Sequence, residues 1–162
     1  MARTLEKRIQ HLEDIHECEQ LQYAYQRYVD NGYDPEGIAS LFMPDGLWEI
    51  KGTGGTAKGR EAIKQHAKNL SAAITWGQHN MMTPSVIIGE DGKTATGAFC
   101  LICMLTMIET GKKDAYILVG RYSNRYVKIN GKWYFSELTG VIDQTAPWDK
   151  GWVKAPMTRE SW

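Results

Sequence analysis

The sequence has no excess of charge of either sign. Nineteen Lys and Arg residues balance nineteen Asp and Glu residues, so the formal net charge of the 162-residue chain is zero. Proteins that bind nucleic acid usually carry a basic patch or stripe that neutralises phosphates. This balance does not indicate such a patch, and we expect no nucleic-acid partner.

Long apolar runs and cysteines are also scarce. A membrane-spanning helix needs about 20 mostly apolar residues, and the first residues lack the apolar segment of a secretory signal peptide. Three cysteines are too few, and an odd number, for a disulfide framework. We therefore expect a cytoplasmic protein with reduced thiols and no membrane partner.

Sequence motifs for metal ions and phosphates are missing as well. Cys100 and Cys103 have CxxC spacing, but residues three apart on a strand point to opposite faces, so the two thiols should not meet. The glycine-rich segment 51–59 lacks the ending of a phosphate-binding loop, and we expect a mobile loop there, at a pocket mouth. We predict no metal ion and no cofactor.

The first half of the chain has helical periodicity. Apolar residues, beginning with Leu5, Ile9 and Leu12, recur at helical spacing and predict one long amphipathic helix over about residues 4–29. The pair Asn31-Gly32 should end this helix. Asp34-Pro35 then predicts a second, short helix, because it combines an N-cap with proline at the first helical position.

The segment that follows predicts a turn, a strand and a third helix. The short helix should bury Ile38, Leu41 and Phe42 and end at the turn formed by residues 44–46. Residues 47–50 read as a short strand. A third helix should then begin after Gly59 and carry apolar residues as far as Leu70.

The second half of the chain is rich in branched and aromatic residues, which favour strands. Four such runs lie at residues 86–88, 98–107, 116–127 and 133–142. Turn signals separate them at Asp91-Gly92, Gly111-Lys112 and Asn130-Gly131. This spacing predicts a four-stranded antiparallel meander, and glycines inside the runs, such as Gly120, are typical of bulges or bends.

Helices followed by a long sheet predict an α+β fold. We expect a cone-shaped α+β barrel, in which three N-terminal helices pack on a strongly curved antiparallel sheet around a pocket. Residues 1–145 should form this single domain, and residues 146–162 a C-terminal tail that packs on it or caps it. The outer face of the sheet would remain free, which predicts a homo-oligomer, either a dimer or a trimer.

Asp30 and His79 are a candidate acid and base pair. A carboxylate bound to one ring nitrogen of a histidine fixes the tautomer and leaves the other nitrogen free to remove a proton. Sequence spacing does not bring the two together, and a lone histidine near a strand is more often an ordinary hydrogen-bonded residue. The residues by themselves leave both readings open.

Several segments resemble a known family. Residues 25–34 and 41–48 resemble the opening of the SnoaL-like branch of the nuclear transport factor two superfamily, residues 58–63 its third helix, and residues 131–135 its last strand. The resemblance spans roughly residues 15–152 and is strongest to the lindane dehydrochlorinase and bile acid dehydratase type, with scytalone dehydratase more distant. It implies elimination of a leaving group after a histidine removes a carbon-bound proton.

The resemblance assigns roles to four residues of this chain. Asp30 takes the place of the dyad carboxylate and His79 that of the base. Tyr25 matches a tyrosine that polarises a carbonyl or assists the leaving group, and Trp48 matches a pocket tryptophan. The proton donor for elimination stays open among Tyr25, other tyrosines such as Tyr33 and Tyr116, and the histidinium formed in the first step.

This chain also departs from the family. Relatives place an arginine on the last strand, where this chain has Leu138 and Ile142, and some place an acid where it has Cys103. Without a cation to pair an anionic group, the pocket should favour a neutral cyclic or aromatic substrate. The predicted pocket lining is Trp48, Tyr33, Phe99, Leu101, Cys103, Tyr116, Tyr134, Ser136, Leu138 and Ile142. Strand alternation, anchored at Cys103 and at Leu138 with Ile142, turns Phe99, Leu101 and Leu105 inward on one strand and Tyr134, Ser136 and Gly140 on the other.

The leading hypothesis is a cofactor-independent lyase, a dehydratase or a dehydrohalogenase, that acts on a small molecule. Isomerisation and cyclisation begin with the same proton abstraction, so the sequence leaves these reactions open. A non-catalytic ligand-binding or small-subunit module is the second hypothesis, because a fold does not determine a function.

Overall fold

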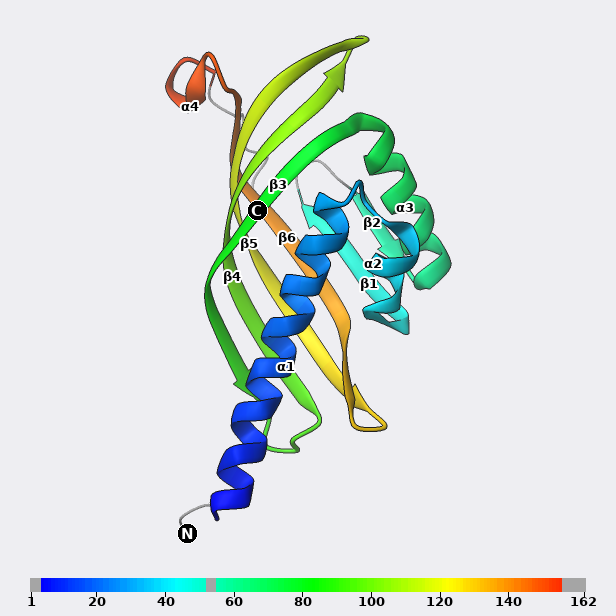
Figure 1. Ribbon diagram of the computed structural model, residues 1–162, viewed down its shortest axis with the longest axis vertical. Coiled ribbons are helices and arrows are strands. Elements are labelled where there is room, and N and C mark those ends of the chain that lie inside the picture. The colour runs from blue at the N-terminus through cyan, green and yellow to red at the C-terminus, as the bar shows by residue number, and fades with distance from the viewer. Residues whose placement is uncertain (1–3, 52–54, 156–162) are drawn as a thin grey trace.

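The computed structural model describes residues 4–51 and 55–155 of the chain. A long first helix crosses one side of a curled sheet, and two shorter helices lie beside its end (Figure 1). The last helix stands apart, next to the opposite end of the sheet from the N-terminus. This arrangement confirms the predicted α+β class with helices packed on a curved sheet.

The first three helices begin where the sequence indicates, and the fourth was not predicted. The helices are α1 (Leu5–Asp30), α2 (Pro35–Ser40), α3 (Arg60–Ala73) and α4 (Gly151–Lys154). Asp34 caps α2 as predicted, because its side chain accepts hydrogen bonds from the backbone N–H groups of Glu36 and Gly37, each at 3.1 Å. No helix in the described residues is long and apolar enough to cross a membrane.

Helix α1 packs on the sheet from about Asp14 onward. Tyr25 and Val29 are each 2% exposed, whereas Leu5, Ile9 and Leu12 are 64%, 48% and 65% exposed. The first turns of α1 project past the end of the sheet (Figure 1). The predicted apolar face is therefore wrong for these turns, because no other element reaches them.

Six strands form one mixed sheet. They are β1 (Phe42–Lys51), β2 (Gly55–Lys58), β3 (Ile74–Ile88), β4 (Thr94–Glu109), β5 (Lys112–Ile129) and β6 (Lys132–Pro147), in the spatial order β2-β1-β6-β5-β4-β3. Strands β3 to β6 form the predicted antiparallel meander. Strand β1 pairs with β6 in parallel, which corrects the purely antiparallel prediction. Strand β1 follows α2 in the chain and is not connected to β6 by a hairpin, so no tight turn imposes an antiparallel direction on the pair.

Predictions for the segment between α2 and α3 are wrong in three places. Phe42 begins β1, where it is fully buried, and does not end the short helix. Residues 44–46 lie within an irregular stretch of β1. Residues 55–58 form β2 against β1 where a loop was predicted, and residues 52–54 lie outside the described part. Pairing with β6, far along the chain, decided the conformation of β1, and β2 pairs with the neighbouring β1.

Two bulges bend β6 against β5. The register shifts between Val119 and Gly120, and again between Arg125 and Tyr126. A β-carbon on Gly120 would lie 2.4 Å from the carbonyl oxygen of Val141, so only glycine fits there. The prediction of a bend at Gly120 is confirmed.

The C-terminal boundary stays a prediction. Strand β6 continues to Pro147, and α4 follows at Gly151–Lys154. The backbone N–H of Trp148 donates to the carbonyl of Ala115, so this part of the proposed tail is tied to β5. Residues 156–162 of that tail lie outside the described part.

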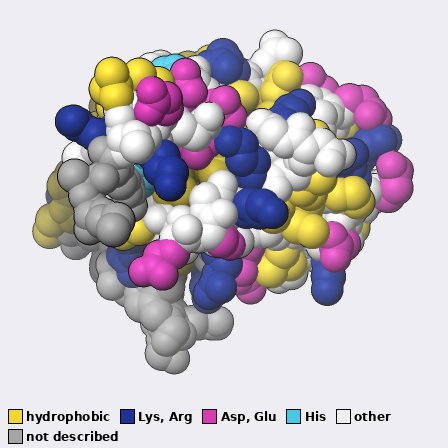
Figure 2. All heavy atoms as spheres, turned by 90° about the horizontal axis from the view of Figure 1, so that it is seen from below, with side chains coloured by type: hydrophobic (Ala, Val, Ile, Leu, Met, Phe, Trp, Pro, Cys, Tyr) yellow, Lys and Arg dark blue, Asp and Glu magenta, His cyan; other side chains and the backbone are white. Residues whose placement is uncertain are grey.

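Charges of both signs mix on the surface. Seen from the end where α1 begins, basic and acidic side chains lie among one another (Figure 2). Elsewhere Lys64 pairs with Glu36 at 2.9 Å and with Glu61 at 3.0 Å. This mixture agrees with the zero net charge.

Candidate active site

Asp30 and His79 form a hydrogen-bonded pair. Asp30 is the last residue of α1, and His79 lies within β3. Oδ1 of Asp30 accepts a hydrogen bond from the backbone N–H of His79 at 2.9 Å and lies 2.7 Å from the ring nitrogen Nδ1. One carboxylate oxygen thus holds both the backbone and the ring of His79, which sets the orientation of the imidazole.

The hydrogen bond with Asp30 uses Nδ1 of His79 and not the second ring nitrogen, Nε2. When Nδ1 donates its hydrogen to the carboxylate, the neutral ring carries its lone pair on Nε2. His79 is 6% exposed and lines an internal cavity. The geometry is that of a general base supported by a carboxylate.

The cavity beside His79 lies between the helices and the sheet and has a volume of about 330 Å³. Small-molecule sites usually have volumes of roughly 300–1,000 Å³. Its wall is largely aliphatic and aromatic, and none of its described lining residues is Lys, Arg, Asp or Glu. The wall consists of Tyr25, Tyr33, Trp48, Ile50, Leu70, Ala73, Ile74, His79, Leu101, Leu105, Met107, Tyr116, Leu118, Tyr122, Gly140, Val141, Ile142 and Thr145.

Tyr25 lies deep in this wall. Its ring packs edge-on against Trp48 and against Tyr122, with centroids 5.8 Å away in each case. Burial raises the pKa of Tyr25 well above its ordinary value, and interaction with the Tyr122 hydroxyl adds to the rise. The hydroxyl of Tyr25 therefore keeps its proton and already has a partner in the wall.

The structure brings many of the predicted site residues together. Tyr25 and His79 meet at the cavity with five of the ten residues predicted to line it. Those five are Tyr33, Trp48, Leu101, Tyr116 and Ile142.

Three of the other predicted lining residues lie in the core. Phe99 is 2% exposed and contacts Tyr23 edge-on, and Leu138 is fully buried. Cys103 is fully buried and faces His79 directly in the pairing of β4 with β3. These side chains support the cavity from behind but do not line it.

Tyr134 and Ser136 are misplaced because of the second bulge of β6. Strand β6 has one extra residue, Ser136, between the partners of Arg125 and Tyr126, so the alternation of inward and outward residues reverses there. Phe135, which is fully buried, takes the inward position in place of Tyr134.

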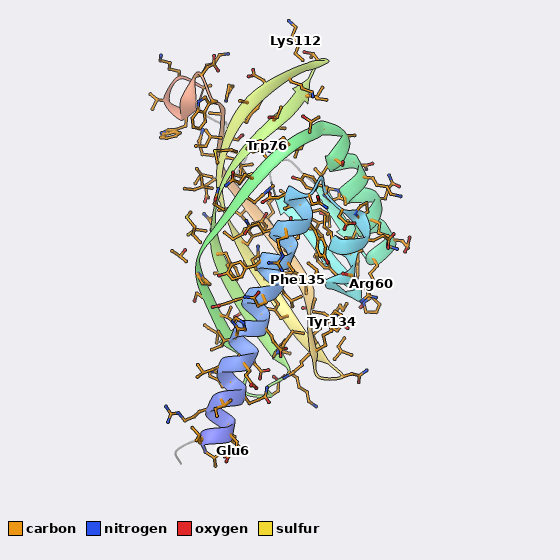
Figure 3. The ribbon with its side chains drawn as sticks, in the orientation of Figure 1. Glu6, Arg60, Trp76, Lys112, Tyr134 and Phe135 are labelled. Carbon is orange, nitrogen blue, oxygen red and sulfur yellow. The ribbon has the colours of Figure 1, made fainter. Side chains whose placement is uncertain are left out.

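Both residues consequently lie away from the cavity. The ring of Tyr134 lies under the guanidinium of Arg60, 5.9 Å from the ring centroid, and Figure 3 shows the pair together near the start of β1. Ser136 borders a separate hollow near the end of β3.

Some lining residues were missed by the sequence analysis. Met107 continues the inward face of β4 beyond Leu101, and Leu118 and Tyr122 continue that of β5 beyond Tyr116. Strand alternation could have identified these three. Leu70 and Thr145 carry no such signal, because the packing of α3 and the first bulge of β6 place them.

The two cysteines of the CxxC motif lie on opposite faces of β4, as predicted. Cys100 is exposed and Cys103 is buried. Burial raises the pKa of the Cys103 thiol, and the nearby Asp30 carboxylate raises it further, so Cys103 stays protonated. Within residues 4–51 and 55–155, no three His, Cys, Asp or Glu side chains are grouped closely enough to hold a metal ion.

Solved structures show the same fold. A type 2 hexachlorocyclohexane dehydrochlorinase is 21% identical, with a TM-score of 0.79 over 94% of this chain and 97% of that protein. A candidate scytalone dehydratase from Novosphingobium aromaticivorans is 19% identical, with a TM-score of 0.74 over 86% and 90%. An NTF2-like protein with a cystatin-like fold from the same organism is 24% identical, with a TM-score of 0.65 over 86% and 88%.

Sequence comparison identifies the family. No curated protein matches the chain. The pattern of the SnoaL-like domain matches residues 10–139, which include Asp30, His79 and most of the cavity wall. This match confirms the resemblance predicted from the sequence, and the chain belongs to the SnoaL-like family.

Proposed function

We propose that the protein is a cofactor-independent lyase that eliminates a leaving group from a small, neutral cyclic or aromatic molecule. The observation that carries the proposal is the Asp30–His79 pair at the wall of an otherwise uncharged cavity. The similar folds of a dehydrochlorinase and a candidate dehydratase support this class of reaction.

The proposed chemistry begins at Nε2 of His79. This nitrogen takes a carbon-bound proton, the electrons of the C–H bond form a double bond, and the leaving group departs with its electron pair. Asp30 stabilises the imidazolium that forms. A departing hydroxide takes the proton back from His79 and becomes water, whereas after departure of chloride the proton passes to solvent. A positioned base of this kind typically increases a rate by about 100- to 10,000-fold.

The wall of the cavity supports a neutral substrate. Its polar side-chain groups are hydroxyls, the imidazole of His79 and the indole of Trp48, and its described residues provide no Lys or Arg to pair a carboxylate or phosphate. An anion buried there would lose its hydration without compensation. Isomerisation or cyclisation after the same proton abstraction is the alternative, and analysis of the products distinguishes these reactions from elimination.

Benzisoxazole chemistry tests the proposal without knowledge of the natural substrate. The nitro derivative of benzisoxazole is a neutral aromatic molecule in which loss of a carbon-bound proton breaks the N–O bond and releases a coloured nitrophenolate. We expect the protein to cleave it faster than the same concentration of free imidazole does. For an analogue with a carboxylate on the benzene ring, the rate acceleration over free imidazole should be about 100-fold smaller, since burial of an unpaired charge costs several kcal/mol.

Spectrophotometric rates at one pH provide this comparison, with substitution of the exposed His16 by alanine as the control for nonspecific catalysis by surface histidines. A rate no higher than that of free imidazole contradicts the proposed lyase. Equal acceleration of the neutral and the anionic compound contradicts the proposed selectivity.

We also propose that the outer face of the sheet pairs with a second copy of the chain. Trp76, Met82 and Ile102 project from the face of β3 and β4 opposite the cavity and are 52%, 37% and 39% exposed. A net charge of zero does not oppose self-association. The same face could serve a non-catalytic subunit, so this proposal is independent of the lyase.

Substitution of Ile102 by aspartate is expected to convert the oligomer to monomer, because it would bury a charge in an apolar interface. Multi-angle light scattering measures the mass directly. The exposed Lys68 on α3, replaced by aspartate, provides the control. A wild-type protein that is already monomeric at micromolar concentration would refute the pairing.

A further inference from the structure

We infer that Tyr33 is a catalytic hydrogen-bond donor, which stabilises the negative charge that develops on an oxygen of the substrate while His79 removes the proton. This inference rests on the proposed function and adds a residue to it. The side chain of Tyr33 lies against the ring of His79, and no residue in the described part of the chain pairs with its hydroxyl.

Tyr33 lies against the base. It is 5% exposed, lines the cavity, and contacts the ring of His79 edge-on, with centroids 6.3 Å apart and planes at 82°. No described residue forms a hydrogen bond with its hydroxyl. Nor is the hydroxyl one of the unpartnered polar atoms sealed inside the protein. The hydroxyl therefore keeps some accessible surface, and Tyr33 is one of the residues that line the cavity.

The other cavity tyrosines are less available. The hydroxyls of Tyr25 and Tyr122 interact with each other. Tyr116 has an interaction of its own and lies opposite Pro147 in the pairing of β5 with β6. Tyr33 is therefore the cavity tyrosine best placed to donate a hydrogen bond to a substrate. Tyr25 differs because its hydroxyl already interacts with that of Tyr122.

The backbone that carries Tyr33 is strained. Gly32 and Tyr33 have φ angles of +75° and +60°, and a bulky residue rarely adopts the left-handed conformation. The backbone N–H of Tyr33 donates to the carbonyl of Val29 at 3.1 Å, and that of Asp34 donates to the carbonyl of Tyr28 at 3.0 Å. These bonds fold the chain back on the last turn of α1, which also carries Asp30, so one turn presents both the carboxylate and the phenol to His79.

The environment of Tyr33 determines which role its hydroxyl can take. Burial raises the pKa of Tyr33 well above its ordinary value, and Tyr25, Cys103 and Asp30 raise it further. Ionised Tyr33 would thus be costly, so the residue donates a hydrogen bond and keeps its proton. When an oxygen leaves, that oxygen takes its proton from the His79 imidazolium, and neutral His79 and neutral Tyr33 are both restored.

Substitution of Tyr33 by phenylalanine removes only the hydroxyl. In this variant, we expect the cleavage rate of unsubstituted benzisoxazole to fall by roughly 100-fold, as on loss of an oxyanion-hole donor. Without a nitro group, more negative charge develops on the oxygen of this compound as the N–O bond breaks. Cleavage of the nitro derivative, whose ring withdraws that charge, should fall much less. Tyr28→Phe, which removes a phenol outside the cavity wall, is the matched control. A purely structural role would slow both compounds equally, and that result would overturn the inference.

A binding measurement tests Tyr33 without catalysis. Acetophenone and ethylbenzene differ mainly in the carbonyl oxygen that accepts a hydrogen bond. In a titration followed by NMR, Tyr33→Phe should lower the affinity for acetophenone by about fivefold, as for one lost hydrogen bond. The affinity for ethylbenzene should not change. Equal affinities for acetophenone in both proteins would refute the donor role. Retained cleavage in His79→Ala would instead refute the proposed function, so the two failures are distinguishable.

Discussion

Replacement of His79 by alanine is expected to lower the cleavage rate of the nitro derivative of benzisoxazole by about 100- to 10,000-fold. The reason is that the variant loses the proton acceptor, while the apolar cavity that concentrates the compound remains. Asp30 keeps the hydrogen bond from the backbone N–H of residue 79, so the carboxylate is not left wholly without a partner. The fold should therefore survive the change.

Three measurements complete this test of His79. Circular dichroism checks that the variant is folded. Added imidazole should restore part of the rate, because it can occupy the space left by the side chain. His16→Ala, a change at an exposed histidine of α1, should have the wild-type rate. A folded His79→Ala protein with wild-type rates would show that His79 is not the base.

Replacement of Lys128 by methionine is expected to lower the free energy of unfolding by about 3–5 kcal/mol, the usual cost of breaking a buried ion pair. Asp14 of α1 is 4% exposed, and its Oδ1 accepts hydrogen bonds from Nζ of Lys128 at 2.5 Å and from Nε1 of Trp133 at 3.0 Å. Without Lys128 the carboxylate would stay buried with no cation beside it. The same contacts tie α1 to β5 and β6, so their loss weakens the packing of the helix on the sheet.

The loss of stability in Lys128→Met should depend on pH. Burial acts to raise the pKa of Asp14, but hydrogen bonds and charge from Lys128, with Trp133 and Gln10, outweigh burial, and the pKa lies below its ordinary value. This stabilisation is present above the pKa of the unfolded chain and is lost as the pH falls through the lower folded pKa. In the variant Asp14 can protonate at less cost, so its difference from the wild type should shrink in acid.

Urea unfolding at neutral and at acidic pH measures both expectations for Lys128. The exposed Lys68, replaced by methionine, is the control and should leave stability nearly unchanged. Asn at position 14 in the Lys128→Met background should recover part of the loss, because an amide replaces the unpaired carboxylate. A loss well below 1 kcal/mol at neutral pH would mean that the pair is solvated and weak.

Local signals predicted much of the architecture. Helical periodicity, the Asp34 cap and the turns at Gly92, Gly111 and Gly131 lie within a few residues of the elements they announce, and all three glycines have positive φ angles. Such signals depend on a residue and its near neighbours, which sequence contains in full. Where pairing between strands decided the conformation, as for β2 and the start of β1 at Phe42, the same signals failed.

Some residues of the candidate site could likewise be predicted from the sequence, and others could not. The resemblance of residues around Asp30 and His79 to the SnoaL-like family predicted that these two residues meet, and their hydrogen bond shows that they do. Alternation on β6 assigned Tyr134 and Ser136 to the cavity, but one extra residue in the strand reversed the faces. A bulge arises from the pairing of two strands, so the sequence of either strand alone does not predict it.

By itself the sequence determined the α+β class, the first three helices and the meander, because hydrophobic periodicity and caps are local properties, and the family resemblance pointed to Asp30 and His79. Only the tertiary structure decided that β1 runs parallel to β6, which side chains line the cavity, and that Tyr33 lines it with no described partner for its hydroxyl. Those features depend on strand register and on backbone turns such as the one at Gly32, which appear only when distant segments have packed together.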